Sequence, residues 1–278
     1  MNQQTASVTE IARDYYDSKD ADNFYAAIWG GEDIHIGLYD SERSIKQASH
    51  ETVLHMARRL RGLKPGAHVL DIGSGYGGAA RVLAGGFGAD VTCLNLSRVE
   101  NDRNDALTKE QGLSDKIAIL EGSFEDIPAN DAAFDIVWSQ DAILHAGDRG
   151  KVLDEVARVL KKGGEFIFTD PMQADALTDA SVLQAIYDRI HLTSLASFGF
   201  YRRELEQRGF SEVAVEDFTN QLRNHYARVK AELAERRPQF EGKISPDYID
   251  RMLAGLQSWV DGADQGHLAW GVMHFEKS

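Results

Sequence analysis

The sequence contains little cysteine and little proline. One cysteine, Cys93, and 5 prolines occur in 278 residues. A single cysteine cannot form an internal disulfide, which indicates a reducing compartment, and we expect Cys93 to be a small core residue on a strand. No apolar run reaches the length of a membrane-spanning helix, and the first residues have neither a basic start nor an apolar run. We therefore predict a cytoplasmic protein that does not enter a membrane.

Positive charge is also scarce. The chain has 30 Lys and Arg against 44 Asp and Glu, which gives a formal net charge of −14. Such an excess of carboxylates disfavours binding to nucleic acid or to an anionic membrane, and it favours a small-molecule substrate. The sequence lacks H-E-x-x-H and pairs of cysteines, so we predict no metal site. It also lacks G-x-S-x-G and a Walker loop, which disfavours a hydrolase or a kinase.

A glycine-rich stretch organises the rest of the chain. Residues 69–81 read VLDIGSGYGGAAR, which predicts a short apolar strand, a tight turn and a helix. Gly73, Gly75 and Gly78 have the G-x-G-x-x-G spacing that lets a nucleotide-like ligand approach the backbone. Asp71 places a carboxylate before this turn, where it would repel a diphosphate and attract a cationic group. Asn95 stands where a nicotinamide-binding protein would need an acid, so the pattern disfavours NAD.

Predicted strands and helices alternate along the chain. This alternation indicates an α/β fold with a mostly parallel sheet wound on both faces, in which ligands bind at the carboxyl ends of the strands. We expect one sheet domain in three parts. These are an aromatic-rich N-terminal helical lid (1–48), a Rossmann-like core (49–170), and helical cap insertions with the closing strands (171–278). After the glycine turn, the expected strands are 90–96, 116–120, 134–138, 165–169, 212–218 and 268–275.

Four motifs in series resemble the class I S-adenosylmethionine-dependent methyltransferases. They are D-I-G-S-G-Y-G, V-T-C-L-N-L-S, F-D-I-V-W-S-Q-D and L-K-K-G-G-E-F-I-F-T-D. The resemblance implies a seven-stranded Rossmann-like sheet with a helical cap, and it implies S-adenosylmethionine as cofactor with S-adenosylhomocysteine as product. The cofactor residues that it implies are Asp71, Gly73, Gly75, Asn95, Leu96, Glu100, Ser123, Phe124 and Gln140.

The resemblance also implies roles for some of these residues. Asp71 accepts a hydrogen bond from the cofactor's ammonium, and Asn95 or Glu100 accepts from the ribose hydroxyls. Phe124 is expected beside the adenine. The sequence departs from the usual pattern twice: Asn95 replaces a commoner acid, and Ser123 replaces an aspartate that often faces the adenine amine.

A closer resemblance narrows the substrate. Residues 139–145, S-Q-D-A-I-L-H, look like a segment of the phosphoethanolamine methyltransferases and of the sarcosine/dimethylglycine N-methyltransferases. The motifs T-D-P-M (169–172), Y-R (201–202) and W-G (270–271) point to the second group, which makes glycine betaine. Alternatives are a related methyltransferase that acts on phosphoethanolamine, a sterol or a natural product, and a catalytically silent cofactor-binding protein.

Methyl transfer to an amine needs alignment, exclusion of water and removal of a proton. His145 is expected to take that proton, with Tyr16 nearby by resemblance. An arginine is expected to bind the substrate's carboxylate. Arg189 is the first choice because the resemblance implies an anion-binding arginine in this part of the cap, and Arg202 and Arg223 are alternatives. The other residues expected at the small-molecule amine are Tyr25, Trp29, Tyr201 and Trp270. The sequence leaves monomer and homodimer open.

Overall fold

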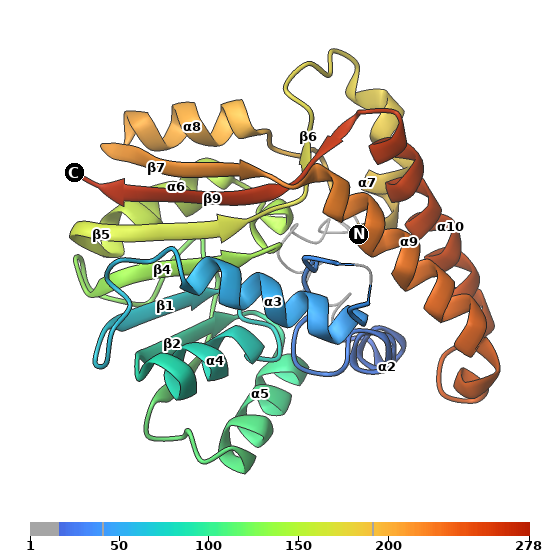
Figure 1. The fold of residues 1–278 in the computed structure, drawn as a ribbon, viewed down its shortest axis with the longest axis horizontal. Helices are drawn as coiled ribbons and strands as arrows, with labels where there is room; N and C mark the ends of the chain where they lie inside the picture. The colour runs from blue at the N-terminus through green and yellow to red at the C-terminus, as the bar shows by residue number, and fades with distance from the viewer. Residues whose placement is uncertain (1–16, 41, 191) are drawn as a thin grey trace, which may run out of the picture.

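A seven-stranded sheet forms the centre of the computed structural model, which describes residues 17–40, 42–190 and 192–278 (Figure 1). The strand order is β3-β2-β1-β4-β5-β9-β7, with β9 antiparallel to β5 and β7 and the other neighbours parallel. This arrangement confirms the predicted mostly parallel Rossmann-like sheet. Its strands are β1 (His68–Ile72), β2 (Asp90–Asn95), β3 (Ile117–Glu121), β4 (Phe134–Gln140), β5 (Leu160–Thr169), β7 (Phe210–Asp217) and β9 (Gly271–Lys277).

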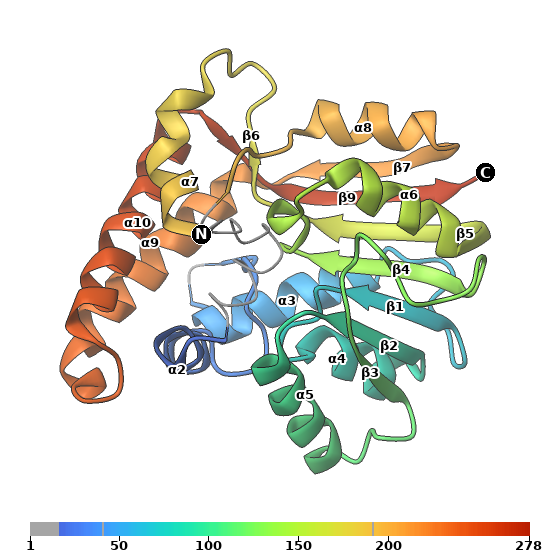
Figure 2. The same cartoon turned by 180° about the vertical axis from the view of Figure 1, so that it is seen from behind.

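Helices cover both faces of this sheet because successive strand residues point to opposite sides. In β1, Val69 packs with the apolar side of α3 (Ile45–Ala57) and α4 (Gly78–Phe87). Its neighbour Leu70 packs on the other face, with α6 (Arg149–Val159) and α8 (Phe198–Gln207) (Figures 1 and 2). Helix α5 (Arg98–Glu110) lies along β2 and β3, and the hydroxyl of Ser97 caps its N-terminus.

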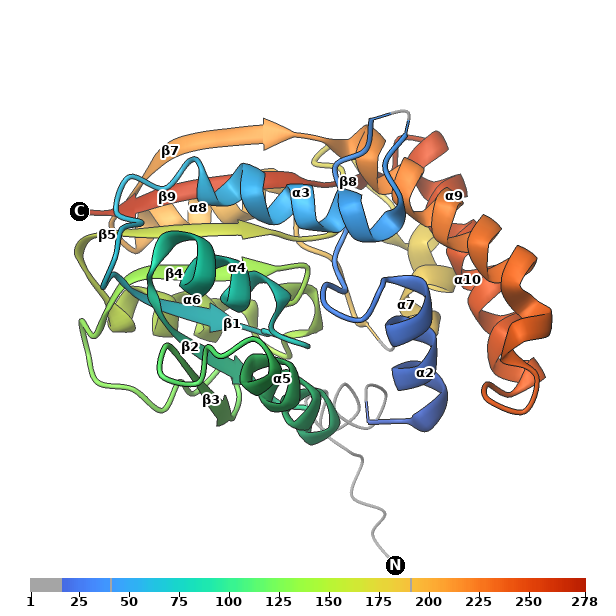
Figure 3. The same cartoon turned by 60° about the horizontal axis from the view of Figure 1, so that its bottom comes forward.

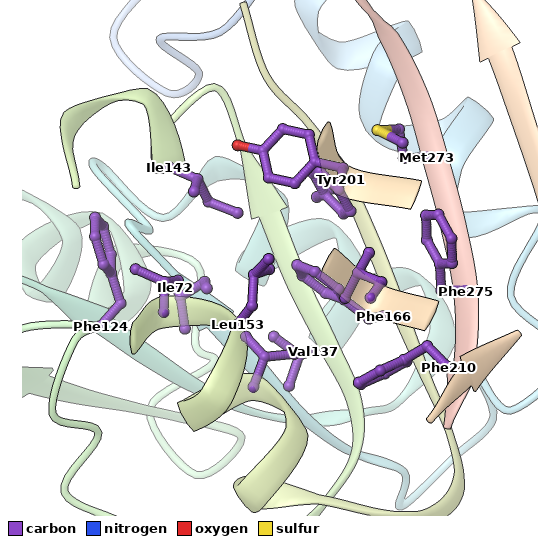
Figure 4. Packing of buried hydrophobic residues seen from close by; sticks show 14 of the residues in the cluster. Ile72, Phe124, Val137, Ile143, Leu153, Phe166, Tyr201, Phe210, Met273 and Phe275 are labelled. Carbon is purple, nitrogen blue, oxygen red and sulfur yellow. The ribbon is translucent and has the colours of Figure 1, made fainter. Parts of the chain in front are cut away.

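Aromatic side chains fill the core on the α6 and α8 face (Figure 4). The Phe166 and Phe168 rings stack with their centroids 4.4 Å apart, and Tyr201 packs edge-on against Phe168. All three side chains are fully buried. Burial of each such ring stabilises the fold by about 1.5–3 kcal/mol, so this face is a packed layer and not a binding surface.

The remaining helices form a cap at the carboxyl ends of the parallel strands (Figures 1 and 3). They are α2 (Lys19–Ile28), α7 (Gln184–Ile190), α9 (Thr219–Arg236) and α10 (Pro246–Asp264). Three short 3-10 turns are η1 (Ile143–His145), η2 (Ala180–Leu183) and η3 (Arg237–Phe240), and β6 (Met172–Gln173) pairs with β8 (Leu268–Ala269). The cap therefore covers the edge of the sheet where ligands bind in such folds.

Two expectations about the later part of the chain need correction. The predicted closing strand 268–275 is interrupted, because β8 belongs to a separate small sheet and β9 begins after Trp270. Helix α8 lies in the range 171–278, in which helical cap insertions were expected, but it does not belong to the cap, because its apolar face packs on the strands beside α6. Within the described residues, no helix is both long and apolar enough to cross a membrane.

Candidate active site

The glycine loop after β1 keeps the conformation that its sequence predicts. Gly73 has φ +73°, which is left-handed, and a Cβ there would lie 2.3 Å from Cβ of Ala142. Only glycine fits this position without a shift of the neighbouring turn. The Gly73 amide donates to the carbonyl of Leu94 (2.8 Å), so the loop is fixed against the end of β2. Bare backbone is therefore presented at the carboxyl edge of the sheet.

A first pocket opens over this loop, and we call it the loop pocket. It brings together all of the residues predicted to bind the cofactor except Asp71. The predicted residues in its lining are Gly73, Gly75, Asn95, Leu96, Glu100, Ser123, Phe124 and Gln140. Each of them follows a parallel strand or starts the next helix, so the topology collects them at one place.

Asp71 lies at the end of β1, outside the residues that line the loop pocket, and is almost completely buried. Burial raises the pKa of this carboxyl to about 7; the charge of His35 opposes that shift and the charge of Asp33 adds to it. Its Oδ2 atom has no hydrogen-bond partner among the described residues. A buried carboxyl oxygen without a donor is costly, and a cationic N–H donor such as an ammonium would satisfy it.

Glu100 is a second buried carboxyl, at the start of α5. Its Oε2 accepts a hydrogen bond from Nδ2 of Asn95 (2.8 Å), and its backbone amide donates to Oγ of Ser97 (3.1 Å). Burial raises the pKa of Glu100 to about 7, against the effect of the Asn95 hydrogen bond. A carboxyl group held at the pocket wall by its neighbours is well suited to accept hydrogen bonds from hydroxyl groups of a ligand.

A second pocket, the chamber, adjoins the loop pocket on the side of the cap. The two pockets share Ile34, Asp141 and His145. The other lining residues of the chamber are Tyr25, Trp29, His35, Ile36, Leu144, Pro171, Arg189, Ile190, His225 and Tyr226. The three shared residues form the boundary at which ligands in the two pockets would meet.

His145 stands at this boundary on the turn η1. The turn is held by Asp170, whose Oδ1 accepts from the backbone amide of Leu144 (2.9 Å). Burial lowers the pKa of His145, and together with the positive charges of Arg149 and Arg189 it brings this pKa to about 4. The imidazole is therefore neutral at physiological pH and has a lone pair that can accept a proton or a hydrogen bond.

Asp141 was not singled out from the sequence, although it belongs to the quoted motif S-Q-D. Its φ is +51°, an uncommon value for a residue other than glycine. Oδ2 accepts from the backbone amide of Ile36 (2.7 Å) and Oδ1 accepts from Nε1 of Trp270 (2.8 Å). Burial raises the pKa of Asp141, while the charge of His35 and these hydrogen bonds oppose the shift. Asp141 thus joins three segments at the boundary.

Residues 33–39, which we call the strap, cross between the sheet and the cap. His35 on the strap is buried and lies 3.5 Å from Oδ1 of Asp33 and 3.3 Å from Nε2 of Gln140. Burial acts to lower the pKa of His35, but hydrogen bonding to Asp33 and the charges of Asp33 and Asp141 raise it overall. The strap shows neither helical nor strand periodicity, so its contacts could not be predicted from the sequence.

Three of the residues predicted to bind substrate line the chamber. Tyr25 and Trp29 present aromatic rings from α2 and the residue after it, with their centroids 5.1 Å apart. Arg189, at the end of α7, contributes a cation, and its stem lies against Gly255 of α10. Tyr16 lies outside the described residues.

The other predicted substrate residues are elsewhere. Tyr201 is in the core on α8, where its hydroxyl donates to Oδ2 of Asp170 (2.6 Å). It therefore stabilises the turn η1 indirectly, through Asp170. Trp270 is fully buried and does not line either pocket. Its Nε1–H donates a hydrogen bond to Asp141. Arg202 pairs with Glu212 on the surface (2.8 Å).

Arg223, named as a competitor of Arg189, also pairs with a surface carboxylate, that of Asp264 (3.0 Å). Tyr201, Arg202 and Arg223 lie on helices, and the sequence motifs did not show which face of the helix each side chain occupies. In the part of the chain that the structure describes, no group of three or more His, Cys, Asp or Glu is arranged to hold a metal ion.

Comparisons with known proteins bear on this arrangement. Residues 70–168 match the family model described as a methyltransferase domain. The chain is 52% identical over 269 residues to the sarcosine/dimethylglycine N-methyltransferase of Halorhodospira halochloris, covering 96% of both chains. It is 47% identical to the enzyme of that name from Aphanothece halophytica, covering 98% of both. A crystal structure assigned as a sarcosine dimethylglycine methyltransferase from Galdieria sulphuraria is 42% identical with a TM-score of 0.90, covering 95% of this chain and 99% of that chain.

Proposed function

The chain belongs to the sarcosine/dimethylglycine N-methyltransferase family, and from this premise we propose that it methylates the nitrogen of sarcosine and of N,N-dimethylglycine. S-adenosylmethionine supplies the methyl group and leaves as S-adenosylhomocysteine, and the final product is glycine betaine. One observation carries this proposal: a loop pocket suited to the donor meets a chamber suited to an amino acid at Ile34, Asp141 and His145.

The loop pocket and the buried carboxyl beside it fit S-adenosylmethionine. The bare backbone at Gly73 and Gly75 in the pocket allows close approach, and the unpartnered Oδ2 of Asp71, two residues before Gly73, supplies a hydrogen-bond acceptor for the donor's ammonium. Asn95 and Glu100 supply oxygens for the ribose hydroxyls. These groups hold and orient the donor, while the surrounding burial excludes water.

The chamber fits a zwitterionic amine. Arg189 provides a guanidinium that can bind a carboxylate with two parallel hydrogen bonds. Asp141 at the boundary provides negative charge toward an ammonium, and the rings of Tyr25 and Trp29 present π faces that favour a cation. The two ends of a small amino acid are thus recognised by opposite charges, with its nitrogen directed to the boundary.

His145 takes the proton that blocks the attacking nitrogen. The ammonium of the substrate must lose one proton before its lone pair can form the new bond to carbon. The neutral imidazole at the boundary accepts this proton, or passes it to water, and the positive charges of Arg149 and Arg189 favour its subsequent release. Tyr16 stays a predicted partner of His145 in this step.

A methyl-transfer assay with mass detection tests the proposal. The purified chain is incubated with S-adenosylmethionine and one of four acceptors: glycine, sarcosine, N,N-dimethylglycine or phosphoethanolamine. We expect a 14-dalton increase for each methyl group that sarcosine or dimethylglycine receives, with betaine as the end product. Methylation of phosphoethanolamine in place of these two amino acids, or of none of the four, would contradict it.

A further inference from the structure

His225 on α9 lines the chamber but has no part in the chemistry derived above. Its side chain is fully buried. The Nδ1 atom accepts a hydrogen bond from the backbone amide of Gly37 (3.2 Å) and lies 2.8 Å from the hydroxyl of Tyr39. Both partners belong to the strap, so the strap fixes the orientation of this imidazole.

These contacts determine which nitrogen of the ring carries the proton. A backbone N–H can only donate, so Nδ1 of His225 must be the unprotonated nitrogen that accepts from Gly37. Burial, together with the charge of His35, lowers the pKa of His225 to about 3, so the ring is neutral at physiological pH. A neutral imidazole with an unprotonated Nδ1 has its single proton on Nε2.

The Nε2–H group is left as a buried donor. Nε2 has no hydrogen-bond partner among the described residues. The two ring nitrogens point in different directions, so Nε2 cannot share the strap partners of Nδ1. The ring of Trp29 lies beside the imidazole with centroids 5.3 Å apart, and Tyr226 packs edge-on at 5.8 Å. A buried donor without an acceptor is unfavourable, so a ligand acceptor in the chamber would satisfy it.

We propose that Nε2–H of His225 donates a hydrogen bond to the carboxylate of the bound amino acid, as a second anchor beside Arg189. This inference rests on the proposed function, since it assumes that the chamber holds an amino acid. Because Gly37 and Tyr39 hold Nδ1, the docked strap fixes the tautomer and the orientation in which this donor lines the chamber.

Kinetics of two substitutions test the inference. His225→Phe keeps a ring but removes the donor, and we expect the KM for dimethylglycine to rise about tenfold or more, since a hydrogen bond to a charged group is lost. The KM for S-adenosylmethionine should change less than twofold. His225→Gln retains an N–H at a similar reach and should recover much of the loss. Tyr39→Phe is the matched control, because Gly37 still fixes the tautomer, and its effect should stay below threefold.

Equal increases in both KM values, or no rescue by glutamine, would assign His225 a structural role and overturn the inference. If the phenylalanine variant does not fold, nitrogen NMR of the wild-type histidines decides the matter. The Nε2–H tautomer of His225 should persist from pH 6 to 8, and its signal should shift when dimethylglycine is added to the complex with S-adenosylhomocysteine. An unshifted signal or the other tautomer refutes it. Absence of wild-type activity on both amino acids would instead refute the proposed function.

Discussion

Asp71 and Glu100 are buried carboxyl groups, and without a ligand their burial raises the pKa of each toward physiological pH. Burial raises the pKa of each to about 7, far above the value of an exposed carboxyl. The ionised form of Asp71 needs a cation to stabilise it. Glu100 already accepts a hydrogen bond from Asn95. Ligand binding at Asp71 should therefore be coupled to loss of its proton.

This coupling predicts a pH-dependent affinity for S-adenosylhomocysteine, which carries the same ammonium as the donor. Below about pH 7 Asp71 must lose a proton on binding, so affinity should rise by up to about tenfold per unit between pH 6 and 7 and then level off. Asp71→Asn should weaken binding at pH 8 by about tenfold or more and flatten this rise. Calorimetry measures both, with the exposed Asp90→Asn as control. An unchanged profile in Asp71→Asn would show that the ammonium binds elsewhere.

Individual site residues were predictable where the chain itself places them. Gly73 and Phe124 follow parallel strands, so their positions in the sequence determine the edge of the sheet at which they lie. Tyr201 and Arg202 were assigned to substrate because of a motif, but a motif does not reveal which face of α8 packs on the sheet. His225 could not be found at all, because its partners are distant strap residues.

At the level of elements, Glu165 in β5 joins the linker before β1 to the sheet. Its carboxylate accepts from the backbone amides of Arg61 (3.2 Å) and Gly62 (2.6 Å) and from Nε2 of His274 on β9 (2.9 Å). Burial alone would raise the pKa of Glu165, but the hydrogen bonds from His274 and the two amides lower it to about 2. A carboxyl with a depressed pKa stabilises the fold at pH values above its ordinary pKa.

Glu165→Gln should lower the free energy of unfolding at pH 7 by about 1–3 kcal/mol, because one oxygen becomes a donor that faces a backbone donor. The difference from wild type should shrink as pH falls from about 4.5 toward 2, where Glu165 itself takes up a proton. Denaturant unfolding at several pH values measures this difference in the free energy of unfolding. Glu212→Gln, which changes an exposed ion pair, should have little effect. A loss that stays constant down to pH 3 would contradict this account.

The helices and strands could be predicted from the hydrophobic pattern of the sequence, but the position of the strap could not. Residues of β1 and β4 read as buried strands, and a glycine-rich turn separated β1 from its helix. The strap is positioned by single hydrogen bonds, such as those from Gly37 to His225 and from Leu38 to Thr52 (3.0 Å). Such long-range contacts leave no local pattern, so this segment of the site became visible only in three dimensions.

For the whole molecule, Asp141 links the sheet, the strap and the last strands. The helices that line the chamber are α2, α7 and α9, so parts far apart in the sequence must be held together (Figure 3). Asp141 does this through Ile36 and Trp270, with both donors buried or nearly so. Loss of its carboxylate would leave two donors without acceptors.

Asp141→Ala should therefore destabilise the protein by about 1–3 kcal/mol for each orphaned donor and release the strap. Hydrogen exchange read by mass spectrometry should show faster exchange in residues 33–39, while peptides of β1 and β2 stay protected. Trp270→Phe removes only one of the two donors and should give a smaller effect on the strap. Uniformly faster exchange across the sheet would indicate general unfolding and contradict a specific role at the strap.

The central claim is that the chamber binds the carboxylate of an amino acid at Arg189 and presents its nitrogen to the loop pocket. The most direct measurement compares steady-state kinetics of Arg189→Met and Arg202→Met with dimethylglycine. The account predicts that Arg189→Met lowers kcat/KM for dimethylglycine about tenfold or more through KM, with the KM for S-adenosylmethionine unchanged, and that the surface variant Arg202→Met behaves as wild type. An unchanged KM in Arg189→Met, or an equal loss in Arg202→Met, would contradict it.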